Sequence, residues 1–277
     1  SLFIIFKIMG LRNASNIGSI LGKFLGPLFR SKKIIRQNIR TGLGEIDKQK
    51  EREIINGMWS NIGRTFAEYV FLKDFKFNRT NFNHIKINGV DYLNQIKKNN
   101  EVVIFYSCHF ANFELMAMEL DKSGIKCAAI YRPLNNFFLN PLMEYLRMKY
   151  ICPNQIPKGR MGMREIISKV KNGYSIALMV DQRVGEGPRT LFFNKPAHTT
   201  TIPAQIALKY NCKLVPISLE RKEGPNFEMT IHEPYKIEKT GNDEEDTKNI
   251  TLKINRVIEK MIIQNPTQWI WSHNRWK

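Results

Sequence analysis

A histidine and a glutamate five residues apart form the most promising catalytic pair in the sequence. His109 and Glu114 lie in the stretch SCHFANFE, directly after the apolar run Val102–Ser107. A carboxylate that holds one imidazole nitrogen orients the ring and strengthens it as a base toward a hydroxyl. On one continuous helix, two residues five apart would point about 140° away from each other. The pair can therefore meet only if His109 lies at a strand-to-helix corner. The spacing alone is equally consistent with a histidine that caps the helix and a glutamate that faces solvent.

The surrounding sequence predicts such a corner, because apolar runs typical of buried strands alternate with helical segments. The expected strands cover 102–107, 126–132, 175–180, 190–193, 213–219 and 227–232, and the expected helices 51–71, 112–122, 139–150, 163–171, 202–210 and 247–263. This alternation predicts an α/β fold with a mainly parallel central sheet that is flanked by helices and ends in a hairpin. His109 would then lie at the carboxyl edge of the sheet, where such proteins place their ligand crevices.

The first 40 residues differ from the rest, and we expect them to form a helical segment ahead of a domain spanning residues 41–277. Their apolar residues repeat at the spacing of one helical face, at Ile17, Ile20, Leu21, Phe24, Leu25, Leu28 and Phe29. Basic residues flank them, at Lys23, Arg30, Lys32, Lys33, Arg36 and Arg40. Gly18, Gly22 and Gly26 form a ladder that would admit a close helix contact. The pattern predicts an amphipathic helix on an anionic membrane, and the alternative is a helix that packs on the domain with a basic, solvated end.

Composition narrows the function classes. The chain has 277 residues, 43% of them hydrophobic, which excludes collagen-like and wholly disordered proteins. A formal net charge of +18 calls for an anionic partner: nucleic acid, an acidic protein or a phosphate-bearing membrane. Nucleic acid is the weakest of these, because the chain has no nucleic-acid-binding motif and its basic residues are not interleaved with aromatic ones. A serine hydrolase is disfavoured because the sequence contains no GxSxG motif.

The four cysteines are too widely spaced for a zinc site or a disulfide scaffold, so we expect reduced thiols. Cys108 directly precedes His109 and could be proposed as a nucleophile. Adjacent residues at the end of a strand point to opposite faces, however, so a His109 that faces the crevice turns Cys108 toward the packed side. A buried thiol also forms little thiolate. We therefore expect no acyl-cysteine intermediate.

The stretch Cys108–Glu114 resembles the His-x4-acid block of the glycerolipid-type acyltransferases. From about residue 34 to its end, the chain is similar to the bacterial lipid A late acyltransferases, the lauroyl and myristoyl transferases. Further blocks of that family match in order: Tyr131-Arg132-Pro133, Asp181, Gly187-Pro188-Arg189, Phe192-Phe193, Thr199-Thr200-Thr201 and the terminal segment Pro266–Lys277. The tryptophans of that last block could form an interfacial belt or one face of a packed segment.

The resemblance implies an activity at the cytoplasmic face of the bacterial inner membrane, with either peripheral or N-terminal attachment. Such enzymes move a fatty acyl chain from acyl carrier protein to a hydroxyl on an acyl chain of a phosphorylated glucosamine disaccharide, without a metal or cofactor. His109 would be the general base and Glu114 its orienting group. Arg147 falls where the family has an arginine near the reacting carbonyl, and Asp181 where it has an essential aspartate.

The expected partners are acyl carrier protein, a phosphorylated glycolipid acceptor and an anionic membrane surface, and not nucleic acid. The residues expected to contact substrate are Arg132, Asn112, Arg183 and Arg189. Arg132 and Arg183 are also alternatives to Arg147, and Arg189 fits a solvent-exposed turn as well as a phosphate contact. An acceptor of another kind, such as a glycerophospholipid or a glycosylated inositol lipid, stays open, as does a coenzyme A thioester donor.

Overall fold

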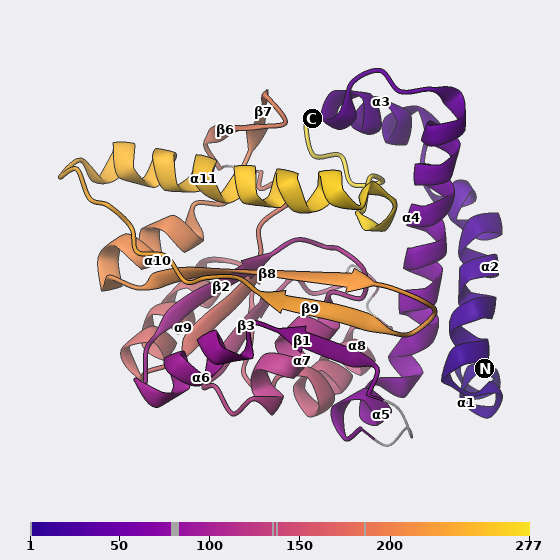
Figure 1. The fold of residues 1–277 in the computed structure, drawn as a ribbon, viewed down its shortest axis with the longest axis horizontal. Helices are drawn as coiled ribbons and strands as arrows, with labels where there is room; N and C mark the ends of the chain where they lie inside the picture. Colours follow the sequence, from indigo (N-terminus) through magenta and orange to yellow (C-terminus); the bar gives the residue numbers. More distant parts are fainter. Residues whose placement is uncertain (1, 79–82, 135, 137, 186) are drawn as a thin grey trace.

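The computed structural model describes residues 2–78, 83–134, 136, 138–185 and 187–277. It confirms the α/β fold: a seven-stranded sheet has the order β1-β9-β8-β2-β5-β3-β4 (Figure 1). Its strands are β1 Ile85–Asn88, β2 Val103–Ser107, β3 Cys127–Tyr131, β4 Gln155–Pro157, β5 Ser175–Met179, β8 Lys213–Arg221 and β9 Phe227–Ile231. Neighbouring strands are parallel except β8 and β9, which form the antiparallel hairpin expected near the end of the sheet. A separate hairpin joins β6 Arg189–Phe192 to β7 Lys195–His198.

Helices cover both faces of the sheet. The helices α6 Val90–Lys98 and α7 Glu114–Lys122 lie on one side, and α10 Ile202–Tyr210 and α11 Asp243–Gln264 on the other (Figure 1). Two further helices, α8 Asn140–Leu146 and α9 Arg160–Lys171, belong to the β3–β4 and β4–β5 connections. The short strands β1, β4 and β7 were not expected, whereas β6, which is also short, was expected at 190–193.

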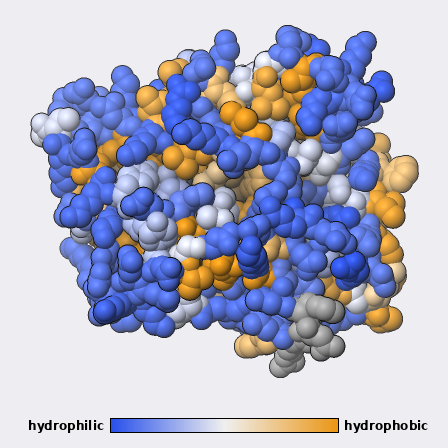
Figure 2. All heavy atoms as spheres, in the orientation of Figure 1, coloured by the Kyte–Doolittle hydropathy of each residue, from blue (hydrophilic) through white to orange (hydrophobic). Residues whose placement is uncertain are grey.

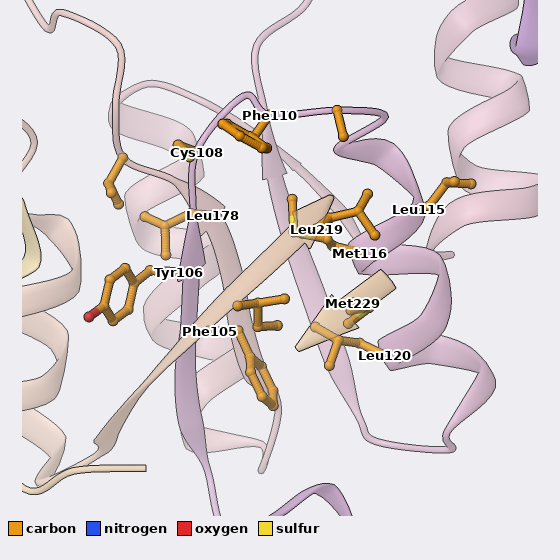
Figure 3. Close-up of a cluster of buried hydrophobic side chains, with 14 of the residues drawn as sticks. Phe105, Tyr106, Cys108, Phe110, Leu115, Met116, Leu120, Leu178, Leu219 and Met229 are labelled. Atoms are coloured by element: carbon orange, nitrogen blue, oxygen red, sulfur yellow. The ribbon is translucent and has the colours of Figure 1, made fainter. Parts of the chain in front are cut away.

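The end of β2 and the start of α7 are fixed by tight packing. Phe105 and Tyr106 project to opposite sides of β2, and Met116 and Leu120 of α7 lie on the Phe105 side (Figure 3). All four side chains are at most 2% exposed. Close-packed interiors resist displacement, so the segment between β2 and α7 has two rigid ends.

Four N-terminal helices, α1 Leu2–Met9, α2 Leu11–Phe29, α3 Lys32–Leu43 and α4 Lys48–Glu68, stand at one end of the sheet (Figure 1). The glycine ladder of α2 lies directly against α4. A Cβ atom on Gly18 would come 2.4 Å from the carbonyl oxygen of Gly63, and one on Gly22 would come 2.2 Å from that of Trp59. Only glycine permits this approach, so the close contact expected from the ladder is confirmed. The division at residue 40 stays a prediction, since that residue lies inside α3.

The opposite face of α2 is apolar and exposed. Five of the seven residues of the predicted stripe are exposed: Ile20, Phe24, Leu25, Leu28 and Phe29. Exposed apolar residues of α1 add to them, at Ile4, Ile5 and Ile8. Figure 2 shows apolar side chains gathered along this edge of the molecule. In the part of the chain that the structure describes, no helix combines the length and apolarity needed to cross a bilayer.

Candidate active site

His109 and Asp181 meet at the carboxyl edge of the sheet. Strands β2 and β5 are parallel neighbours whose register pairs Ser107 with Met179, so the residues two positions further on also lie side by side. The Nδ1 atom of His109 is 2.8 Å from Oδ1 of Asp181, and the backbone N–H of His109 donates to Oδ2 at 3.1 Å. Trp269 Nε1 donates to the same Oδ2 atom at 2.8 Å. Three hydrogen bonds thus hold a carboxylate that is only 1% exposed.

The surroundings of Asp181 keep it ionised. Burial acts to raise the pKa of this carboxyl, but the charge of His109 and the hydrogen bonds from His109 and Trp269 outweigh it and lower the pKa to about 2. An ionised carboxylate accepts a proton-bearing Nδ1–H, which leaves the lone pair on Nε2 of His109. The His109 side chain is 20% exposed and lines a cavity of about 400 Å³. Its Nε2 atom lies 3.3 Å from the side-chain nitrogen of Gln182, which lines the same cavity.

Glu114 has different partners from those expected. Its Oε1 atom accepts hydrogen bonds from Arg147 Nε at 3.0 Å and Nη2 at 2.5 Å, and from the Tyr69 hydroxyl. As the first residue of α7, Glu114 faces the end of α4 and the π-helical turn Arg147–Ile151. The carboxylate that orients His109 in this structure is therefore Asp181, 72 residues away in the chain, and not Glu114.

Arg147 has one guanidinium nitrogen that is left unpaired. Its side chain is 10% exposed and lines the cavity, and its Nη1 atom is buried without a hydrogen-bond partner among the described residues. Burial acts to lower the pKa of this guanidinium, but the contacts with Glu114 and Tyr69 outweigh it and raise the pKa above its ordinary value. Buried polar groups are rarely left unpaired, so Nη1 is suited to an acceptor atom of a ligand.

The cavity itself is mostly apolar. Small and apolar side chains from the sheet and from α7 line it, namely Phe105, Met116, Ala117, Leu120, Ala129 and Ala177. At its exposed rim lie Arg132 and Lys158, which follow the neighbouring parallel strands β3 and β4. Burial and the neighbouring charge of Arg132 lower the pKa of Lys158. An apolar hollow with a few convergent polar groups is the usual form of a small-molecule site.

The expected substrate contacts divide into one residue at the cavity and three elsewhere. Arg132 lines the cavity. Asn112 is completely buried and does not line the cavity, and its amide donates to Glu68 at 2.9 Å. Arg183 is held by its backbone N–H, which donates to His273 at 2.9 Å, and Arg189 is exposed on the β6–β7 hairpin. Neither of these two arginines lines the cavity.

Cys108 is turned away from His109, as expected from their adjacency. It is 1% exposed and lines a second cavity of about 210 Å³ together with Ser218 and Met261. Burial raises the pKa of its thiol well above the ordinary value. Few thiolates form under such conditions, so Cys108 is not suited to act as a nucleophile.

Two groups at this site were not foreseen. Tyr69 carries no motif that marks it, and it reaches Glu114 only because α4 ends beside α7. Trp269 belongs to the terminal aromatic block, which the structure places in the interior: Trp269 and Trp271 are both fully buried, with ring centroids 4.6 Å apart. The packed-segment interpretation is therefore correct for these two tryptophans.

Comparison with known proteins identifies similar sequences over almost the whole chain. A model of the family described as bacterial lipid A biosynthesis acyltransferase matches residues 1–277. A lipid A biosynthesis lauroyltransferase of Escherichia coli (strain K12) is 24% identical over 270 residues, covering 94% of this chain and 84% of the relative. A lipid A biosynthesis acyltransferase of Haemophilus influenzae is 25% identical over 259 residues, covering 90% and 78%, and the E. coli palmitoleoyltransferase is 23% identical over 266 residues, covering 94% and 84%. The chain therefore belongs to the bacterial lipid A biosynthesis acyltransferase family.

Proposed function

We propose that this acyltransferase moves a fatty acyl chain from the thioester of acyl carrier protein to a hydroxyl of a lipid A precursor. One observation carries the proposal: His109 is held through Nδ1 by buried Asp181 and lines an apolar cavity, in a chain of the lipid A acyltransferase family. The relatives named after lauroyl and palmitoleoyl transfer support a fatty acyl substrate.

The proposed step is direct transfer in a ternary complex. The acceptor hydroxyl gives its proton to Nε2 of His109 while its oxygen bonds to the thioester carbonyl carbon. The carbon–sulfur bond then breaks, and the proton passes from the imidazolium to the leaving thiolate. Asp181 stabilises the imidazolium and keeps the ring in the productive orientation.

Arg147 is proposed to stabilise the carbonyl oxygen as it becomes negative. Its unpartnered Nη1 donor supports this role, because a donor placed in advance in a water-poor site needs no reorganisation during the reaction. Glu114 and Tyr69 hold the other side of the guanidinium. In this proposal Glu114 acts through Arg147 and is a positioning residue.

The substrates fit the chemistry of the cavity and the surface. The acyl chain would occupy the hollow lined by Phe105, Met116 and Leu120. Both an acidic carrier protein and a phosphorylated acceptor suit a chain of net charge +18. Arg132 and Lys158 at the rim are placed to meet a phosphate of either substrate.

The direct test is mass spectrometry of lipids after the purified protein is incubated with acyl carrier protein thioesters and a lipid A precursor. We expect an acceptor that gains the mass of one acyl chain. A parallel series replaces the donor with acyl coenzyme A and the acceptor with a glycerophospholipid or a glycosylated inositol lipid. Transfer only to one of those other acceptors would overturn the lipid A assignment.

We further propose that the protein works at the cytoplasmic face of the inner membrane, with the outer face of α2 on the lipid. Removing residues 1–40 would be a poor test, because α2 packs so closely on α4 that the fold itself would suffer. Substituting exposed residues is cleaner. Phe24→Ser with Leu28→Ser should weaken flotation with anionic vesicles at least tenfold, since burying each side chain contributes roughly 1.5–3 kcal/mol.

A matched control changes two exposed apolar residues elsewhere. Val90→Ser with Ile263→Ser removes apolar surface from α6 and α11 and should leave flotation unchanged. Equal loss in both double variants would show that α2 has no special part in membrane binding.

A further inference from the structure

We propose that the buried ion pair between Glu68 and Arg221 sets the position of the loop that carries His109. In this proposal Ser15 of α2 helps to hold the pair in place through its hydrogen bond to Glu68. The inference rests on the proposed acyl transfer, and it concerns residues that touch neither substrate. Glu68 and Arg221 act through the loop and are positioning residues.

The ion pair lies between the last turn of α4 and the end of β8. Glu68 is 0% exposed and Arg221 is 8% exposed. Arg221 Nη1 donates to Oε1 of Glu68, and Arg221 Nη2 donates to Oε2 at 3.0 Å, so the contact is bidentate. The third guanidinium nitrogen, Nε of Arg221, donates to Oδ1 of Asn61 at 2.9 Å, and Nη1 also donates to the carbonyl oxygen of Gly224 at 2.9 Å. A pair with this many fixed partners has one geometry.

Two lines of hydrogen bonds run from this pair to the loop after His109. In the first, Asn112 donates to Oε2 of Glu68 at 2.9 Å. In the second, Asn61, held by Arg221, donates to the carbonyl oxygen of Ala111 at 3.0 Å. Both residues of the loop lie between His109 and Glu114, and both are buried.

The loop needs such support because its backbone is unfavourable. Ala111 has a φ angle of +50°, a left-handed conformation that a non-glycine residue adopts at a cost. Its N–H donates to the carbonyl oxygen of Gln268, and its carbonyl also accepts from Thr65 at 3.3 Å. A strained conformation persists only where its surroundings over-determine it. The network from Glu68 and Arg221 supplies part of that constraint and fixes the direction in which the chain leaves His109.

Ser15 of helix α2 is also part of this hydrogen-bond network. The Ser15 hydroxyl donates to Oε1 of Glu68 at 2.8 Å, and Arg64 Nη1 donates to Ser15 Oγ at 3.0 Å. Ser15 is 0% exposed and lies on the face of α2 that contacts α4. The helix that presents apolar residues to the outside is thus joined, through one carboxylate, to Asn112 beside the catalytic histidine.

Stability alone gives a weak reason for this arrangement. A buried ion pair loses about as much solvation as it gains in attraction, and apolar replacements are often as stable. What the pair provides here is a single geometry for Asn61 and Asn112. Because these two residues hold the loop after His109, a change in the ion pair should alter the rate of the chemical step more than the binding of substrate.

The test compares two serines on the same face of α2. Ser15→Ala removes the hydroxyl that contacts Glu68, whereas Ser19→Ala removes a hydroxyl bonded to Ser60 at 2.7 Å, outside the network. Both residues are at most 4% exposed, so each variant removes a buried hydroxyl, and the Tm of each is measured to separate a loss of stability from a loss of rate. We expect Ser15→Ala to lower kcat about 3- to 10-fold with KM nearly unchanged, and Ser19→Ala to leave both constants within about 2-fold.

Glu68→Gln tests the ion pair itself and should lower kcat by up to about 100-fold, again with little change in KM. If that variant does not fold, the comparison of Ser15→Ala with Ser19→Ala still tests the positioning role. Equal kcat values for Ser15→Ala and Ser19→Ala, with wild-type protein active, would overturn the positioning role and leave the proposed function standing. Wild-type protein that transfers no acyl chain to a lipid A precursor would overturn the proposed function instead.

Discussion

Asp181 and Glu114 are two buried carboxylates whose partners, His109 and Arg147, both line one cavity, and their neighbours differ in kind. Asp181 follows β5 and is bound by an imidazole, a backbone N–H and an indole. Glu114 begins α7 and is bound by a guanidinium and a phenol. The first arrangement prepares a base that can take a proton, and the second fixes a permanent cation that can only donate hydrogen bonds.

The two arrangements correspond to the two requirements of acyl transfer. The hydroxyl must lose a proton, and the carbonyl oxygen must gain stabilisation as its charge grows. The same residue type supports either task, depending on which side chain it touches. The role of a catalytic carboxylate therefore follows from its contacts and not from its distance along the chain to the histidine.

The largest effect is expected on the Asp181 side. Asp181→Asn keeps the shape but removes the charge that stabilises the imidazolium, and it favours the wrong histidine tautomer. We expect kcat to fall by about 10³-fold or more, as such changes do in other His–Asp enzymes. The control is Asp246→Asn, which alters another buried aspartate, 2% exposed, that accepts hydrogen bonds from Thr240 far from the cavity. Comparable losses in both variants would deny Asp181 a special role.

A smaller loss is expected on the Glu114 side. Glu114→Gln leaves Arg147 in place but without its charged partner, so the guanidinium is held less firmly and kcat should fall about 10²-fold. Glu119→Gln is a matched control, because Glu119 lies on the same helix, is 5% exposed and pairs with Lys122 at 2.7 Å. Steady-state assays of both variants check this prediction, and a Glu114→Gln protein with wild-type kcat would contradict it.

Acid should destabilise the protein through a histidine close to Asp181. Burial lowers the pKa of His273, which lies beside the Asp181 centre, from its ordinary value of 6.5 to about 4. Between those values the unfolded chain binds a proton that the folded chain does not, so the free energy of unfolding falls as the pH falls through this window. His273→Gln can still accept the N–H of Arg183 and should show a shallower loss between pH 6.5 and 4 in denaturant titrations. An unchanged pH dependence would show that His273 does not contribute.

The smallest effect is expected at Cys108, which lies on neither side of the cavity. Cys108→Ser should retain most activity, because the thiol lines a different cavity and is rarely ionised. Initial-rate kinetics should be sequential, and intact-protein mass spectra with donor alone should show no added acyl chain. An acyl group found on Cys108, and lost when acceptor is added, would replace direct transfer by a two-step mechanism.

Much of the fold could be predicted from the sequence, because long apolar runs and helical spacings show which nearby residues are buried. The strand before His109, the helix after it and the close contact of α2 were all predicted from such patterns. The glycine ladder was informative for a physical reason: at Gly18 and Gly22 no side chain fits.

The partner of His109 could not be predicted from local spacing. Glu114 was expected because it lies five residues on and because the resemblance to the His-x4-acid acyltransferases implied it, but the register of β2 and β5 brings Asp181 to the imidazole instead. Strand order is set by the packing of the whole sheet, and no local pattern encodes it. The same holds for Glu68 and Arg221, whose contact joins residues 153 positions apart. The burial of Asn112 against Glu68 was not expected for the same reason, since it depends on a helix far earlier in the chain.

The most direct test of the account places Glu114→Gln in an Asp181→Asn background and measures single-turnover acyl transfer. If Asp181 serves the base and Glu114 serves Arg147, the two losses arise from separate groups, and the double variant should be slower than Asp181→Asn by nearly the factor seen for Glu114→Gln alone. If both carboxylates act through His109, the second substitution should add almost nothing to the first, and the division of roles drawn from the structure would be wrong.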